Sequence, residues 1–183
     1  MRNLLPLLLL ILIINGCSTI KKSGTLSAES EHKYGSGIDF SEQSTWLLGY
    51  FNFNQITGQP HSEWYLREYD NYQINYESLN KLHETDKENL SIKIVMGTWC
   101  PDSRREVPRF IRITDMWQFP VTKITFIGVD NAKLSPVGEY DGLNIERVPT
   151  FIIYKNNIES GRIIETPKTS LEQDLVNIIT SNE

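Results

Sequence analysis

The chain has 183 residues, a formal net charge of −5 and 39% hydrophobic residues, a composition typical of one acidic globular domain with an additional segment. Its two cysteines and three histidines exclude a disulfide-stabilised scaffold and a zinc ribbon. The negative charge, without a block of lysine or arginine, argues against nucleic-acid binding, which requires a basic surface.

Residues 1–16 predict a signal peptide. Arg2 precedes an apolar run that Pro6 alone interrupts, and the run is shorter than a typical membrane span. The four residues Ile-Asn-Gly-Cys that end at Cys17 resemble the lipobox of bacterial lipoproteins, in which the cysteine is diacylated on sulfur and the chain is cut just before it. An uncleaved anchor and a plain secretory signal are the alternatives. We expect acyl chains on Cys17 to anchor the protein without a spanning helix.

Residues 17–40 are expected to be the lipidated cysteine followed by a flexible tether. The segment is rich in serine, glycine and charged residues and shows no apolar period. Lipidation of Cys17 leaves Cys100 as the single thiol of the folded domain, so no intramolecular disulfide can form.

Residues 41–85 predict a helical extension of the domain. Apolar residues recur at helical spacing after Ser41, and a second stripe runs between Ser62 and Leu82. The stripes comprise Trp46, Leu47, Tyr50 and Phe51, and then Tyr65, Tyr69, Tyr72, Tyr76 and Leu79. Such aromatic stripes indicate core packing more often than a surface for ligand stacking.

Residues 90–180 alternate between strand and helix patterns and predict the core of one α/β domain that spans residues 41–183. Strands are expected at 91–96 and 121–129 around a helix at 103–117, followed by a hairpin of 149–154 and 158–165 that turns at Asn156 and Asn157. A capping-box pattern at 169–172 opens a last helix through Ile179. This order predicts a mixed β-sheet flanked by helices on both faces.

One short motif, GTWCPDS at residues 97–103, lies where a strand ends and a helix begins. The unpaired backbone N–H groups and the dipole of a helix N-terminus stabilise an anion, so Cys100 is expected to be partly thiolate at neutral pH. A thiolate attacks disulfides, whereas a thiol barely does. Pro101 fits the first helical position because the N–H that it lacks would be unpaired there.

Charged residues surround this motif, and their net effect on the sulfur stays open. Asp102 opposes a thiolate, whereas Arg104 and Arg105 favour it if they turn back toward the sulfur. Arg147 could meet an acidic substrate or the carboxylates of glutathione, or be solvated. The acidic residues within 130–141 show no metal-ligand spacing, so we expect no metal and no cofactor.

The sequence Trp99-Cys100-Pro-Asp-Ser103 resembles the W-C-x-x-C motif of thioredoxin-fold proteins, with Ser103 in place of the second cysteine. Pro108 is similar to the proline that kinks the active-site helix of that family, and Pro149 to its cis-proline. The chain is therefore identified as resembling a thioredoxin-like protein of the bacterial lipoprotein branch, and the resemblance covers roughly residues 90–179.

The resemblance implies a role for each matched position. Cys100 would be the nucleophile, and Pro149, kept cis, would present the backbone of Val148 and Thr150 to an extended substrate peptide. Trp99 would form an apolar wall for substrate beside Pro101, or simply pack in the core.

Two departures from the family pattern agree with each other. Ser103 cannot close a disulfide, so an external thiol must resolve any mixed disulfide at Cys100. Ile94 stands where many thioredoxins bury a carboxylate that serves the second cysteine. The Ser103 hydroxyl, three residues after Cys100, could instead donate a hydrogen bond to the thiolate.

These observations leave two functions open. The first is monothiol thiol-disulfide exchange, of the isomerase or reductase kind, on the extracytoplasmic side of a bacterial envelope. Its expected partners are envelope proteins or a small thiol, together with a partner reductase. Ser18 after Cys17 hints at sorting to the outer membrane. The second is a non-catalytic peptide-binding or redox-sensing module, in which Cys100 has lost its catalytic role.

Overall fold

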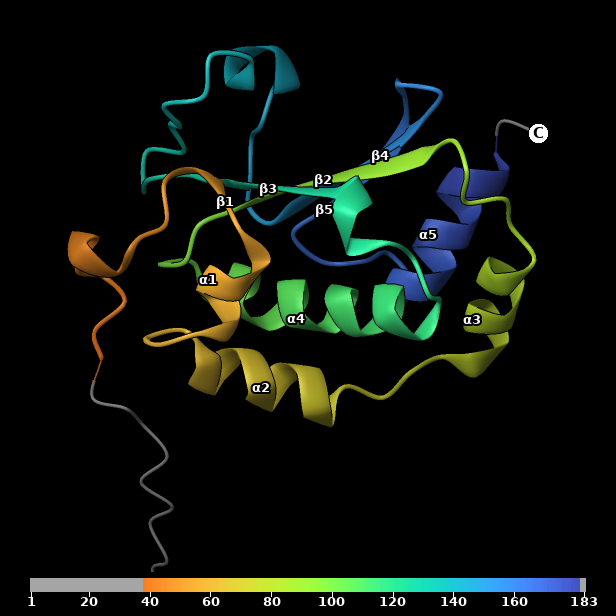
Figure 1. The fold of residues 1–183 in the computed structure, drawn as a ribbon, viewed down its shortest axis with the longest axis horizontal. Helices are drawn as coiled ribbons and strands as arrows, with labels where there is room; N and C mark the ends of the chain where they lie inside the picture. Colours follow the sequence, from red (N-terminus) through yellow and green to blue (C-terminus); the bar gives the residue numbers. More distant parts are fainter. Residues whose placement is uncertain (1–37, 182–183) are drawn as a thin grey trace, which may run out of the picture. The chain divides into compact units, whose positions relative to one another are not determined.

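A computed structural model describes residues 38–181, so the predicted signal peptide, the lipidation site Cys17 and most of the tether lie outside the described residues. The helices and strands of the described part follow in chain order (Figure 1): η1 Gln43–Thr45, β1 Gly49–Phe51, α1 Phe53–Thr57, α2 Ser62–Asn71, α3 Tyr76–His83, β2 Leu90–Met96, α4 Pro101–Met116, η2 Val121–Lys123, β3 Ile124–Gly128, η3 Tyr140–Leu143, β4 Thr150–Lys155, β5 Ile158–Ile164 and α5 Leu171–Thr180. Within residues 38–181, no helix is both long enough and apolar enough to cross a membrane.

The strands form one five-stranded mixed sheet in the order β1-β3-β2-β4-β5. β2 and β3 are parallel, and the other three pairs are antiparallel. β4 and β5 form the predicted hairpin, and Asn156 and Asn157 both take positive φ angles at its turn, a backbone conformation that asparagine tolerates. The predicted fold class, a mixed sheet flanked by helices, is confirmed. The prediction of helices on both faces needs correction, because within residues 38–181 every α-helix contributes to the cluster on one face, and the other face carries the 3-10 helix η3.

Each face of the sheet buries its own cluster of side chains. Ile92 and Ile94 of β2 point to the larger cluster, which they share with apolar residues of α4 and α5. Val95, which points to the opposite face, packs with Tyr140 and Leu143 of η3. In Figure 1, α4 runs along one face with α2 on its far side, whereas the loop that carries η3 rises from the other face. Cys100 belongs to the smaller cluster, beside η3.

The extension is mostly helical, but its first predicted helix is wrong. Residues 49–51 form the edge strand β1, which pairs with β3. Gly49 has a φ of +73°, which interrupts a helix, and Tyr50 is exposed whereas Phe51 is buried, a period of two. The free edge of β3 supplies the hydrogen-bonding partners that the local sequence pattern does not show.

The second predicted helix is divided into α2 and α3. Asn75 caps α3 by accepting a hydrogen bond from Ser78 N at 3.2 Å, and Asn75 N donates to the buried carboxylate of Glu172 at 2.9 Å. The aromatic stripe is divided as well, because Tyr65 is buried whereas Tyr76 is 62% exposed. At the C-terminal end, Ser170 caps α5 by accepting from Gln173 N at 3.1 Å, one residue later than the predicted capping box.

Candidate active site

Cys100 is the N-cap residue of α4, as its place between a strand and a helix predicted. Strand β2 ends at Met96, and Pro101 occupies the first turn of the helix. As the N-cap residue, Cys100 adjoins the unpaired N–H groups of that turn, which in general favour a negative charge, but its side chain makes no capping hydrogen bond. The residue is 7% exposed, so most of its surface is covered by protein.

The cis-proline loop lies directly against this sulfur. The Val148–Pro149 bond is cis, which confirms the prediction, and Cys100 Sγ donates a hydrogen bond to Val148 O at 3.3 Å. Thr150 Oγ1 donates to Arg147 O at 2.6 Å and holds the loop in shape. The fold therefore brings together two segments that are about fifty residues apart in the sequence.

Ser103 is fully buried, and its Oγ accepts a hydrogen bond from Gly97 N at 3.3 Å. This bond ties the first turn of α4 to the end of β2. The Cys100 sulfur donates its hydrogen bond to Val148 O. A hydrogen bond from the Ser103 hydroxyl to the sulfur stays a prediction. Ile94 is fully buried in the larger core cluster.

Trp99 is half-buried beside the motif, and its Nε1 donates to Val129 O at 3.0 Å. Its indole lies over Gly97, where an added Cβ would come within 2.4 Å of Nε1. The ring also contacts Trp46, with the two ring centroids 6.4 Å apart. Packing is thus one role of Trp99, and its exposed part leaves room for contact with a substrate.

The segment before β1 contacts the motif, and sequence reasoning missed it. Thr98 is buried, its Oγ1 donates to Thr45 O at 3.2 Å, and the same oxygen accepts from Leu47 N at 3.2 Å. Trp46 Nε1 donates to Phe40 O at 3.0 Å. Thr98 itself could have indicated this packing, because a threonine hydroxyl in a buried motif needs hydrogen-bond partners.

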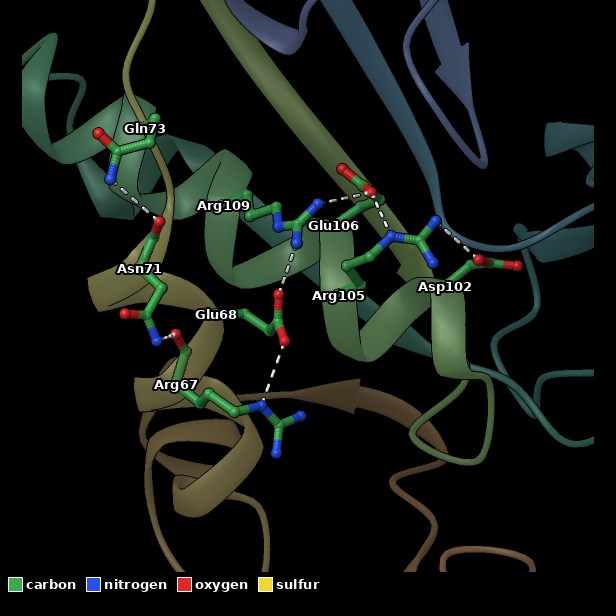
Figure 2. Close-up of polar contacts among 8 residues, drawn as sticks. All are labelled: Arg67, Glu68, Asn71, Gln73, Asp102, Arg105, Glu106 and Arg109. Carbon is green, nitrogen blue, oxygen red and sulfur yellow. Dashed lines mark hydrogen bonds and ion pairs between the residues drawn. The ribbon is translucent and has the colours of Figure 1, made fainter. Parts of the chain in front are cut away.

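Two arginines after Cys100 take opposite directions. Arg104 turns back, and its Nη1 donates to Thr98 O at 2.9 Å and Trp99 O at 3.0 Å. Arg105 lies between two carboxylates, at 2.8 Å from Asp102 and 2.6 Å from Glu106 (Figure 2). The negative charge of Asp102, which would oppose a thiolate, is therefore paired.

The other charged candidates have partners on the protein. Arg147 pairs with Glu165 at 2.8 Å, and this hydrogen bond raises the pKa of Arg147. Asp130 Oδ1 accepts from Leu134 N at 2.8 Å within a turn. In the described part of the chain, histidine, cysteine, aspartate and glutamate do not gather in threes as a metal site would need.

Comparison with known proteins agrees with this geometry. The protein named “Putative thioredoxin-5” of Dictyostelium discoideum is 34% identical over 94 residues, which cover 49% of this chain and 84% of that relative. A solved structure of a protein of unknown function from Pseudomonas aeruginosa aligns with a TM-score of 0.54 at 12% identity, over 72% of this chain and 93% of that one, and shares the fold. No family model matches.

A mixed sheet, a cysteine at a helix start and a facing cis-proline define a thioredoxin-like site. The chain belongs to the thioredoxin family.

Proposed function

We propose that this protein performs monothiol thiol-disulfide exchange on the extracytoplasmic side of a bacterial envelope, anchored by lipid on Cys17. The observation that carries the proposal is the position of Cys100 as the N-cap residue of α4, with its Sγ 3.3 Å from Val148 O beside the cis-proline. The likeness to a thioredoxin supports a redox role for the same site.

The exchange needs no group besides the substrate and a second thiol. The Cys100 thiolate attacks one sulfur of a substrate disulfide, a new S–S bond forms, and the other substrate sulfur leaves as a thiolate that takes up a proton. An external thiolate then attacks the substrate sulfur of the mixed disulfide and releases Cys100. Envelope proteins, glutathione or a partner reductase would supply that thiol. Because Ser103 cannot attack the mixed disulfide, the intermediate should persist until such a thiol arrives.

The test is intact-mass analysis of the full chain after incubation with glutathione disulfide. A Cys17→Ser background leaves Cys100 as the single thiol, and Cys17→Ser/Cys100→Ser is the matched control. We expect one glutathione adduct that reducing agent removes, and no adduct on the control. An unmodified protein at neutral pH would refute exchange chemistry.

A second candidate is a peptide-binding module, which the 7% exposure of Cys100 favours. A disulfide-containing peptide that binds Cys100→Ala as tightly as the wild type, without forming an adduct on either protein, would establish it. For the anchor, expression of the full chain in a bacterium should place the protein in the membrane fraction. Cys17→Ser should move it to the soluble fraction, and Cys100→Ser should not.

A further inference from the structure

Arg104 folds back over the beginning of its own helix. A single nitrogen, Nη1, donates to the carbonyl oxygens of Thr98 and Trp99, the two residues before Cys100. The guanidinium is therefore held at the end of α4 where the sulfur lies. Burial lowers the pKa of Arg104, whereas the electrostatic influence of Cys100 raises it, and Arg67 lowers it. An arginine stays charged despite such shifts, so a positive charge remains near the sulfur.

The ring of Phe40 lies against this guanidinium. The Arg104 Cζ atom lies 4.8 Å from the centroid of the Phe40 ring, a cation–π contact. Phe40 is fixed in turn, because its carbonyl oxygen accepts from Trp46 Nε1. Through Phe40, the segment of residues 38–47 therefore contacts the guanidinium that is bonded to the two residues before Cys100.

No carboxylate competes for Arg104 among the ion pairs of residues 38–181. The neighbouring Arg105, in contrast, is paired with Asp102 and Glu106, as Figure 2 shows. An arginine without a carboxylate partner keeps its attraction for a nearby thiolate, whereas a paired arginine is largely neutralised.

We propose that Arg104 is a positioning residue that stabilises the Cys100 thiolate, and that Phe40 holds it in place, so that the segment 38–47 is part of the active site. The proposal deepens the proposed function and rests on it, because it assigns the origin of the reactivity of that same sulfur. It also gives the extension before β1 a role besides packing.

The experiment measures alkylation of Cys100 by iodoacetamide in the full chain carrying Cys17→Ser. The rate at about pH 7 is divided by the rate at alkaline pH, where the thiol is fully ionised. This ratio reports the thiolate fraction, because any change in access to the sulfur affects both rates equally. Arg104→Gln removes the charge, Arg104→Lys keeps it, Phe40→Leu removes the ring and Phe40→Tyr keeps it.

Arg112 offers a matched control on the same helix. Its Nη1 also donates to two consecutive carbonyls, of Tyr69 and Asp70, and its guanidinium also lies over an aromatic ring. It stands eight residues further along α4, roughly 12 Å from Arg104 along the axis. Arg112→Gln therefore removes the same net charge and the same kind of contacts, but far from the sulfur.

We expect Arg104→Gln to lower the ratio about tenfold and Phe40→Leu about threefold. Arg104→Lys, Phe40→Tyr and Arg112→Gln should stay within about twofold of the parent. Equal ratios for the parent, Arg104→Gln and Phe40→Leu would overturn the proposal, as would an equal loss in Arg112→Gln. If Arg104→Gln fails to fold, Phe40→Leu decides alone.

The glutathione experiment is independent of this one, since a protein without a glutathione adduct still gives a ratio of alkylation rates for each variant.

Discussion

Thr98→Val should detach the segment 38–47 from the active-site loop while leaving the loop filled. Valine keeps the shape of threonine and removes the hydroxyl, which both donates to Thr45 O and accepts from Leu47 N. Each bond contributes on the order of 1 kcal/mol, and each partner is left unpaired in a half-buried place. We therefore expect the free energy of unfolding to fall by about 2 kcal/mol, which lowers Tm by roughly 4–8 °C in a domain of this size.

Urea unfolding measures the loss, with Thr98→Ser as the matched control. Serine keeps the hydroxyl and removes one buried methyl, so its cost should be about 1 kcal/mol. Amide hydrogen exchange gives a local readout, because loss of its acceptor should speed exchange at Leu47 N about tenfold or more. The reasoning is refuted if Thr98→Val stays within about 0.5 kcal/mol of the wild type, or if serine costs more than valine.

Two further predictions concern residues outside the motif. His61 is buried, and its Nδ1 has no hydrogen-bond partner within residues 38–181. Burial is the larger cause that lowers the pKa of His61, and the charge of Arg104 is the smaller one. The unfolded chain then binds the proton more readily than the folded one, so the stabilisation should be fully present above about pH 6.5 and should be lost as the pH drops toward the lower pKa of the folded state. Urea unfolding at several pH values should show a smaller loss of stability in His61→Gln than in the wild type. Equal dependence of the unfolding free energy on pH in the two proteins would contradict this. Trp117 is fully buried, stacks on Phe119 with centroids 4.9 Å apart, and its Nε1 donates to Leu82 O. Trp117→Ala should cost about 3–5 kcal/mol in denaturant unfolding, and a loss below about 1 kcal/mol would show that the site collapses without penalty.

The parts of the fold that could be predicted are those that neighbouring residues determine. The β-branched residues 91–96 favour a strand, and Pro101 is suited to the first turn of a helix and to few other places. The pair Asn156 and Asn157 tolerates the positive φ angles of the turn between β4 and β5. For these elements the local preferences and the tertiary structure agree, so the sequence pattern alone suffices.

The parts that could not be predicted depend on partners far away in the sequence. The break between α2 and α3 is stabilised by Glu172, which lies 97 residues after Asn75. Strand β1 forms because β3 offers an unpaired edge, and no pattern within residues 46–51 reports that edge. The direction of Arg104 depends on Phe40, whose ring lies over the guanidinium only once the chain has folded. Sequence reasoning therefore identified the sulfur, the loop that faces it and the charged residues beside the motif, but not which of the two arginines turns back.

The features that this site has lie beside the nucleophilic sulfur of Cys100, whereas the features that it lacks would act on a second, resolving sulfur. The helix N-terminus and the Val148 carbonyl adjoin Cys100, and we propose that the guanidinium of Arg104 acts on the same sulfur. A second cysteine and a buried acid would act on a resolving sulfur, and Ser103 and Ile94, both fully buried, fill those places. A carboxylate in place of Ile94 would be a charge in an apolar core with no thiol to deprotonate, and its desolvation would cost several kcal/mol. If the protein performs the proposed monothiol exchange, a site without a resolving cysteine has no use for the acid, and its one sulfur depends on an external thiol for its release.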